Sequence, residues 1–285
     1  MAERRGHGGW RCLTTGDGAR IRWKRGFGRT GLLLVPGFGG DGSCWGAAFP
    51  RFLSERGVAP VVYDPRGLGG SAGGSPEPSL EVFARDAAAV AEAAGAPLPV
   101  LGWSMGASVA AALALARPDL VSALVLCCCP ADRRRPARSG PENFSLLTDG
   151  DPSEAALALA EALTPPEGWS GSFARAFRRN LSDYFARHEE AVRGQQAVLK
   201  RLPPLEGVLG RLSLPVLAVE GEGDRLVPPG EGLSAAATKG LIRRTLPGGH
   251  GLLYECPREL ADLVADFLME EITAPLSGPG CPGRT

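Results

Sequence analysis

The chain has 285 residues, of which 44% are hydrophobic, and this is enough for one large domain with a single core. Its 31 basic and 31 acidic residues leave no net charge, so whole-chain charge predicts neither a nucleic acid nor an anionic membrane as a partner. No apolar run approaches the roughly 18 residues that cross a bilayer, and the first ten residues lack the apolar core of a secretory signal. We therefore expect a cytoplasmic protein with no membrane partner.

In chain order, the first expected elements are two strands, Trp10 to Leu13 and Ala19 to Trp23, which a Gly-Asp-Gly turn at residues 16–18 joins into an antiparallel hairpin. Short apolar runs then recur, and most are separated by segments of helix length. This alternation predicts an α/β fold, with a mostly parallel eight-stranded sheet and helices on both faces. The six runs lie at residues 32–35, 58–63, 98–103, 121–129, 214–219 and 241–246.

Two helices of the expected α/β core are visible in the sequence. Residues 79–94 carry apolar side chains such as Leu80, Phe83 and Ala87 at spacings of three and four, which is typical of an amphipathic helix, and Gly95 is expected to end it. A second helix, at residues 254–270, follows the last expected strand.

The alternation of strands and helices breaks between residues 131 and 212, where arginines, prolines and helix formers replace the apolar runs. Such an insertion is most simply a helical cap over the edge of the sheet where open α/β folds bind ligands. We predict a core formed by residues 10–130 and 213–271 and a cap at residues 131–212. The tail at residues 272–285 is rich in Gly and Pro and is expected to be disordered.

Seven cysteines occur, an odd number with no paired Cys-x-x-Cys spacing. The pattern argues against a disulfide framework and against a zinc site, so we expect no metal. Three cysteines are consecutive at residues 127–129, directly after Val125 and Leu126, and we expect them to be small hydrophobic side chains within a buried strand.

The most informative motif is Gly-Trp-Ser-Met-Gly at residues 102–106, between an expected strand and the Ala-rich stretch at residues 107–116. A strand, Gly-x-Ser-x-Gly and a helix in this order are typical of a nucleophile elbow, because small flanking residues permit the sharp turn that exposes the serine hydroxyl. The alternative is an ordinary serine between a strand and a helix. We predict that Ser104 is a nucleophile.

A serine nucleophile needs a base within hydrogen-bond reach and an acid that orients the base. Of the three histidines, only His250 lies in a Gly-rich loop after the last expected strand, whereas His7 and His188 lie in segments that favour a surface role. Asp224 lies in a tight loop just past the strand at residues 214–219. We therefore expect His250 to be the base and Asp224 the acid.

The chain order Ser, acid, His resembles the α/β-hydrolase family, and the resemblance covers about residues 10–270. Besides the elbow and the loops of Asp224 and His250, it rests on Pro-Gly-Phe-Gly-Gly at residues 36–40 and Tyr-Asp-Pro-Arg-Gly-Leu-Gly-Gly-Ser at residues 63–71. Some relatives place the acid after an earlier strand, which leaves Asp132 as an alternative.

The resemblance also implies an oxyanion hole formed by the backbone amides of Phe38 and Met105. Gly37 and Gly39 would let this loop approach the substrate closely. Trp103 would either line the substrate pocket or serve only in packing. Where many relatives have His-Gly, this chain has Pro-Gly at residues 36–37, a difference that bears on the shape of the loop. Asp64 and Arg66 are expected to form a structural ion pair within the neighbouring motif.

Taken as a member of this family, the chain is expected to be a serine hydrolase with a helical cap, similar to carboxylesterases, pimeloyl-carrier methyl esterases and enol-lactonases. The resemblance implies cleavage of a carboxylic ester, lactone or thioester of a small to medium apolar substrate through an acyl-enzyme, without a cofactor. Hydrolysis of a carbon–carbon bond, or a lyase reaction, on a diketone-type metabolite is the alternative. A binding protein without activity is a third possibility, which the presence of a candidate nucleophile, base and acid together disfavours.

The expected cap carries a group of arginines against the neutral total charge of the chain. A solvated helix face is one interpretation of these side chains. The other is a docking surface for an acidic acyl carrier protein. The arginines concerned are Arg175, Arg178, Arg179, Arg187 and Arg193.

Overall fold

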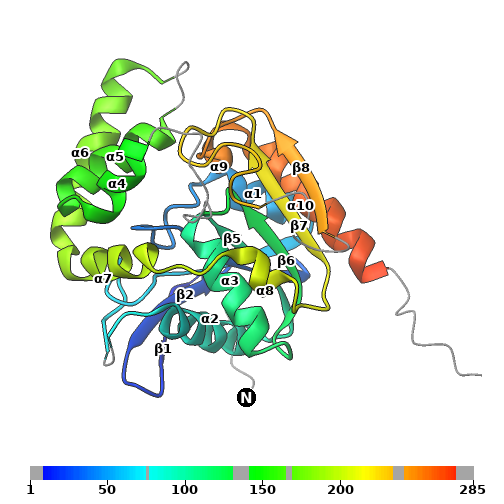
Figure 1. Cartoon of the computed structure of the whole chain (residues 1–285). Helices are drawn as coiled ribbons and strands as arrows, with labels where there is room; N and C mark the ends of the chain where they lie inside the picture. The colour runs from blue at the N-terminus through cyan, green and yellow to red at the C-terminus, as the bar shows by residue number, and fades with distance from the viewer. Residues whose placement is uncertain (1–8, 75–76, 131–140, 165–168, 234–240, 274–285) are drawn as a thin grey trace, which may run out of the picture.

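An eight-stranded sheet with strand order β1-β2-β4-β3-β5-β6-β7-β8 organises the molecule (Figure 1). The computed structural model describes residues 9–74, 77–130, 141–164, 169–233 and 241–273. Strands β3 to β8 are parallel to one another, whereas β2 pairs antiparallel with both β1 and β4, so the predicted fold class is confirmed. The strands are β1 Arg11–Thr14, β2 Arg20–Arg25, β3 Thr30–Val35, β4 Val58–Tyr63, β5 Leu98–Trp103, β6 Val121–Cys127, β7 Val216–Gly221 and β8 Leu241–Leu246.

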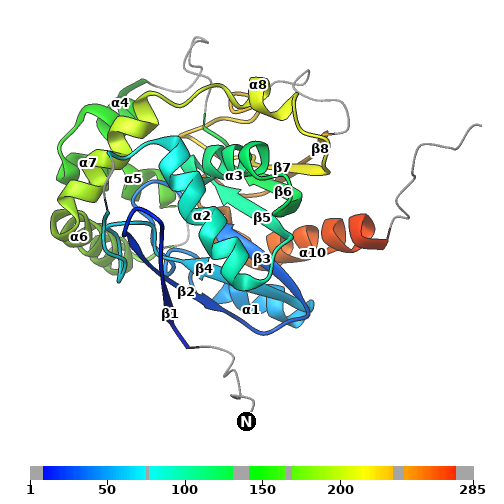
Figure 2. The same ribbon diagram turned by 90° about the horizontal axis from the view of Figure 1, so that it is seen from below.

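Helices cover both faces of the sheet (Figure 2). Helices α2 (Leu80–Ala94) and α3 (Met105–Ala116) pack together on one face, and α1 (Ala48–Glu55) and α10 (Pro257–Thr273) pack together on the other. The sequence signals of α2 act as expected: the Ser79 hydroxyl accepts the Val82 N–H at 3.2 Å, and Gly95 ends the helix with φ of 95°.

The prediction of a single helix at residues 254–270 is wrong. The structure has two helices there, α9 (Leu252–Glu255) and α10, which are separated at Cys256. The break has a local cause, because Pro257 disfavours helical backbone in the residue before it and is itself well suited to begin a new helix.

The prediction for the three consecutive cysteines is right about burial, and about the strand it is right for Cys127 and wrong for Cys128 and Cys129. All three side chains are buried, but β6 ends at Cys127. Cys128 takes φ of 46°, a left-handed conformation that a strand residue does not adopt. The chain therefore turns sharply where the carboxyl ends of the parallel strands meet.

Among the described residues, five helices follow β6 before the chain returns to the sheet at β7, and we refer to the first four, α4 to α7, as the inserted helices. They lie together on one side of the molecule (Figure 1). Asp151 and Glu154 form a reciprocal cap at the start of α5, where Pro152 occupies the first turn. The helices are α4 Pro141–Asp149, α5 Pro152–Leu163, α6 Gly171–Arg187 and α7 Glu189–Lys200, and the short α8 Leu205–Leu209 leads to β7.

The division into a core and a cap stays a prediction, since the start of the expected cap, residues 131–140, lies outside the described residues. Of the tail expected to be disordered, residues 272–273 belong to α10, and residues 274–285 lie outside the described residues. Over the described part of the chain, no helix combines the length and apolar character needed to span a bilayer.

The expected ion pair between Asp64 and Arg66 is wrong. The buried Asp64 carboxylate accepts from Arg22 Nε at 2.7 Å, and Arg66 instead donates to Asp86 at 2.6 Å and to Asp17 at 3.0 Å. Asp64 and Arg66 thus each pair with a residue far away in the sequence, which only the folded arrangement brings within hydrogen-bond distance.

Candidate active site

Ser104 lies on the sharp turn between β5 and α3, at the carboxyl end of the sheet. Its backbone has φ of 54° and ψ of −125°, outside the regions that non-glycine residues normally occupy. The turn leaves no room for side chains on either flank: a Cβ at Gly102 would lie 2.3 Å from the Gly106 oxygen, and one at Gly106 would lie 2.2 Å from the Val35 oxygen. The two motif glycines are therefore a steric requirement of the elbow.

The structure brings together the three side chains that the sequence analysis selected. Ser104 Oγ lies 3.0 Å from His250 Nε2, and His250 Nδ1 lies 2.8 Å from Asp224 Oδ2. The imidazole is fully buried. Hydrogen bonds thus run without interruption from the carboxylate through the imidazole to the hydroxyl.

Asp224 is held rigidly at the far end of this chain of hydrogen bonds. Its second oxygen, Oδ1, accepts the Leu226 N–H at 2.9 Å and the Val227 N–H at 2.8 Å. Burial alone would raise the pKa of Asp224, but the charge and hydrogen bond of His250, together with these two amides, hold that pKa below its usual range. The group is therefore an ionised carboxylate at neutral pH, as an orienting acid must be.

Side-chain hydrogen bonds help to hold the loop that carries His250. Trp103 Nε1 donates to the main-chain oxygen of His250 at 2.9 Å, and the Gly249 N–H donates to the Glu255 carboxylate at 3.0 and 3.1 Å. No sequence motif marks Glu255, because a carboxylate that binds a neighbouring amide has no characteristic pattern.

The loop at residues 36–40, which follows β3, passes close to Ser104. A Cβ on Gly37 would lie 3.2 Å from Ser104 Cβ. The Gly40 N–H donates to the Gly37 oxygen at 3.1 Å, which closes a four-residue turn. Within the described residues, neither the Phe38 N–H nor the Met105 N–H has a hydrogen-bond partner. The two amides expected to form an oxyanion hole are thus both free to donate.

The inserted helices contact this loop directly. Gln195 on α7 accepts the Gly39 N–H at 2.7 Å, and the Tyr184 hydroxyl on α6 donates to Asp41 Oδ2 at 2.8 Å. Tyr184 also accepts the Gly69 N–H at 2.9 Å. Neither Gln195 nor Asp41 carries a sequence signal for these roles, so neither is among the predicted site residues.

Beside these contacts, a cavity of about 300 Å³ is lined by the loop and Trp103 on one side and by the inserted helices on the other. Among the predicted substrate-binding residues, Trp103 and Gly39 line the cavity, while Gly37 lies against Ser104 instead. The walls are mainly apolar. From the inserted helices they include Leu159, Leu163, Phe177, Leu181 and Tyr184, and from the rest of the chain Phe38, Cys44 and Tyr254.

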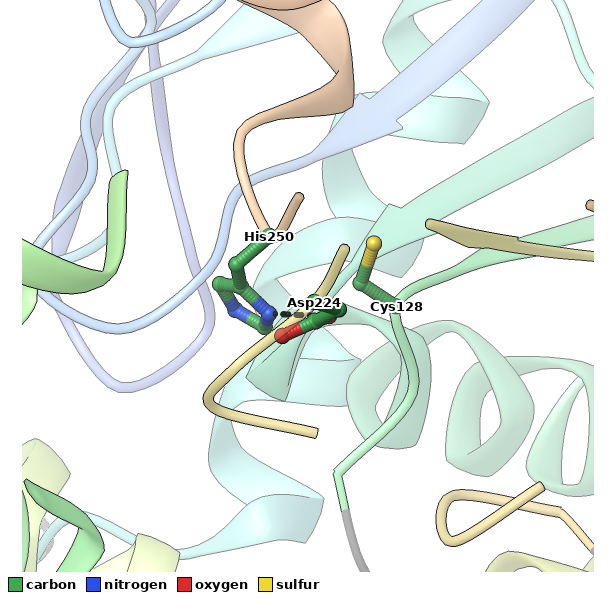
Figure 3. A group of neighbouring side chains, drawn as sticks. All are labelled: Cys128, Asp224 and His250. Carbon is green, nitrogen blue, oxygen red and sulfur yellow. Dashed lines mark hydrogen bonds and ion pairs between the residues drawn. The ribbon is translucent and has the colours of Figure 1, made fainter. Parts of the chain in front are cut away.

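Cys128 is the third member of a group with Asp224 and His250 (Figure 3). One ligand atom from each of the three lies within 4.8 Å of the others, a spacing compatible with a metal ion among the described residues. Two features disfavour a metal. Burial, and then the Asp224 charge, raise the pKa of the Cys128 thiol well above its usual range, so it is a neutral thiol. A metal would also replace the hydrogen bond between Asp224 and His250.

The sequence also offers one alternative acid and two further histidines as candidates for the site. Asp132, the alternative acid, and His7 lie outside the described residues. His188 is only half-buried, with Nδ1 at 2.9 Å from the Gly67 oxygen, so its ring connects the inserted helices to the loop after β4.

Comparison with protein families gives a match over most of the chain. A model described as "Alpha/beta hydrolase family" matches residues 32–263. A "Pimeloyl-[acyl-carrier protein] methyl ester esterase" from Methylococcus capsulatus is 33% identical over 223 residues, which are 74% of this chain and 83% of the relative. A "Pyrethroid hydrolase" from Sphingobium wenxiniae is 27% identical over 258 residues, 84% of this chain and 87% of the relative.

Solved structures agree with the family match. The crystal structure of a hydrolase from Pseudomonas aeruginosa superposes with a TM-score of 0.74 at 27% identity, covering 92% of this chain and 99% of that one. An esterase from Rhodococcus, RhEst1, superposes with a TM-score of 0.73 at 24% identity over 91% of this chain and 98% of its own, which shows a shared fold.

Proposed function

Because the chain belongs to the alpha/beta hydrolase family, we propose that it is a serine hydrolase that cleaves a carboxylic ester, lactone or thioester of a small to medium apolar substrate. One observation carries this proposal: the continuous hydrogen bonds from Asp224 through His250 to Ser104, with Ser104 on a sharp turn. We name these three residues the triad.

In the first step, His250 Nε2 accepts the proton of Ser104 while Oγ attacks the substrate carbonyl carbon. The 3.0 Å separation between the two atoms suits direct proton transfer. Asp224, through His250 Nδ1, holds the ring in the tautomer that leaves Nε2 free to accept, and stabilises the imidazolium that forms.

The negative charge that develops on the substrate oxygen would be bound by the amides of Phe38 and Met105. Both are backbone donors, so they need no rearrangement during the reaction, and in comparable sites each donor contributes about 3 to 4 kcal/mol to transition-state binding. The imidazolium then protonates the leaving group, which leaves an acyl group on Ser104. Water activated by His250 releases this acyl group in a second cycle.

The cavity beside the loop indicates the class of substrate. Its volume of about 300 Å³ and mainly apolar walls suit an uncharged group of modest size. The buried carboxylate of Asp41 is part of its lining and would repel an anionic group. We assign Trp103 and Gly39 to substrate contact and Gly37 to the close approach of the loop to Ser104.

The proposal is tested by labelling with a fluorophosphonate, followed by peptide mass spectrometry. We expect one labelled peptide, which contains Ser104, and no label in Ser104→Ala or His250→Ala. Turnover of aryl esters of graded chain length should favour short and medium acyl groups. Label on another residue, or aryl ester turnover by Ser104→Ala, would reject the assignment of the nucleophile.

Carbon–carbon bond hydrolysis or a lyase reaction on a diketone-type metabolite would use the same triad. Parallel assays of an aryl ester and a vinylogous diketone separate the two functions. Turnover of the diketone alone would replace the ester hydrolase proposal.

The arginines of α6 support a second proposal, that the acyl substrate is presented by an acidic carrier protein. Arg175, Arg178 and Arg179 are exposed on the helix that also supplies Phe177 and Leu181 to the cavity wall. One relative is named for an acyl-carrier protein substrate. We expect the triple Arg→Glu variant to lose activity on a carrier-bound ester and to keep activity on the free ester. Equal loss on both substrates would reject a docking role.

A further inference from the structure

We infer that Gln195 is a positioning residue for the proposed reaction, which holds the loop at residues 36–40 so that the Phe38 N–H faces the substrate oxygen. This inference rests on the proposed function. Gln195 lies on α7, 156 positions away from Gly39, whose N–H it accepts at 2.7 Å in a buried hydrogen bond. The inserted helices thereby contribute to the geometry of the loop that carries one of the two donor amides.

The loop needs such a contact because its turn has two accessible forms. The hydrogen bond from the Gly40 N–H to the Gly37 oxygen places Gly39 third in the turn, with φ of 67°, as in a type II turn. In a type I turn the third residue has negative φ, and the peptide between Phe38 and Gly39 is turned over. Glycine adopts either conformation readily. Gln195 selects the observed one, because the turned-over peptide would direct the Gly39 N–H away from its acceptor.

The side chain of Phe38 is restrained from the same direction. Its ring packs edge-on against the fully buried Phe185 of α6, with ring centroids 5.5 Å apart and an interplanar angle of 88°. A Cβ on Gly39 would lie 2.2 Å from Phe185 Cζ, so only glycine fits against this ring. Phe38 therefore lies between two fixed neighbours. On one side Gly37 packs against Ser104, and on the other side is Phe185 of the inserted helices. Both its side chain and the peptide that follows it are fixed.

The neighbouring residue on α7 is a matched control. Gln196 is the same residue type and is as deeply buried, at 4% exposure against 2% for Gln195. Its Nε2 donates to the oxygens of Leu147 and Gly150 at 3.0 and 2.9 Å. Its hydrogen bonds therefore connect the inserted helices to one another and not to the loop, so its loss reports on the packing of these helices.

The test compares Gln195→Met with Gln196→Met in the full-length protein. Methionine keeps the volume of glutamine but does not replace its carbonyl acceptor. For Gln195→Met we expect kcat on an aryl ester to fall about 10-fold, less than the roughly 100-fold or more that follows deletion of an oxyanion donor, with KM within about 2-fold. A trifluoromethyl ketone, which forms a tetrahedral adduct with the serine, should bind about 10-fold more weakly. Gln196→Met should keep the wild-type kcat and the wild-type affinity for the ketone, even if its Tm falls as much as that of Gln195→Met.

Two further measurements separate positioning from general damage. Gln195→Glu retains an acceptor oxygen and should restore kcat to within about 3-fold of the wild type. Hydrogen exchange of the peptide that contains residues 36–40 should be faster in Gln195→Met and unchanged in Gln196→Met, a readout that needs no turnover.

Equal kcat values for the two Met variants, or a change in KM alone, would overturn the role of Gln195. A wild-type protein that neither labels at Ser104 nor hydrolyses esters would instead reject the proposed function, and the hydrogen exchange would then still decide whether Gln195 holds the loop.

Discussion

Trp103 Nε1 donates a hydrogen bond to the main-chain oxygen of His250 at 2.9 Å, and the indole and imidazole ring centroids lie 5.9 Å apart. The residue before the candidate nucleophile thus holds the loop of the candidate base. The two residues are 147 positions apart. This contact therefore helps to set the position of His250 relative to Ser104, the two groups that exchange a proton in the proposed reaction.

Trp103→Phe removes this donor and keeps an aromatic ring in the core. We expect kcat on an aryl ester to fall about 10-fold, because the His250 loop gains freedom, and the free energy of unfolding to fall by about 1 kcal/mol for the lost hydrogen bond. Steady-state kinetics and urea unfolding measure the two effects. Trp45→Phe is the control, because Trp45 Nε1 is buried without a partner in the described part of the chain. An equal loss of kcat in both variants would contradict the role of the hydrogen bond.

Asp224→Asn should lower kcat by about 10⁴, as replacement of the acid by its amide does in a comparable triad, because the amide favours the wrong tautomer of His250. Folding should persist, since the amide oxygen can still accept from Leu226 and Val227. Asp132→Asn, the variant of the alternative acid, should keep kcat within about 3-fold of the wild type. Loss of turnover in Asp132→Asn with a fully active Asp224→Asn would move the acid to Asp132.

Gly106→Ala should destabilise the protein by at least about 2 kcal/mol, because the new Cβ meets a backbone oxygen that cannot move away by rotating a side chain. A Cβ at position 106 would lie 2.2 Å from the Val35 oxygen. Gly207→Ala in α8 is the control: its Cβ would meet nothing within 4 Å, and alanine favours a helix. Urea unfolding of both variants checks the pair, and a Gly106→Ala protein as stable as the wild type would show that the elbow has more room than described.

Ser104→Gly should raise the free energy of unfolding by about 1 kcal/mol relative to Ser104→Ala, because glycine adopts the φ of 54° without strain. Neither variant should hydrolyse an aryl ester. Thermal unfolding of the two inactive variants is the measurement. If the glycine variant were the less stable one, backbone strain at Ser104 would not be a property of this protein.

Stability should fall at alkaline pH because of the buried thiols. Burial first, and then Cys129 and Cys256, raise the pKa of Cys127 in the folded protein, whereas the unfolded chain releases the same proton from about pH 8.5. The stability that this thiol contributes is complete below about pH 8.5 and is lost as the pH rises above it. Cys127→Ala should flatten the decline of Tm between about pH 8.5 and pH 10.5. The exposed Cys12 provides the control Cys12→Ala, and equal slopes in both variants would contradict the effect.

Local features of the chain predicted much of the fold. Ser79 and Gly95 delimit α2, and the six apolar runs correspond to the parallel strands, because caps and strand periodicity act over a few residues. The errors also have local causes that the pattern hides. Pro257 breaks the last helix, and Cys128 leaves the strand in a left-handed conformation although its side chain is as apolar as a strand residue's.

The sequence by itself determined the elbow, since Gly102 and Gly106 are required within a few residues of Ser104 by the sterics of the turn. It also selected Asp224 and His250, through their positions after successive strands. Only the tertiary structure decided the partners of Asp64 and Arg66, and the contacts of Gln195 with Gly39 and of Glu255 with Gly249. The physical reason is that backbone sterics act between neighbours in the chain, whereas a buried polar side chain bonds whichever group the packing of the helices brings to it.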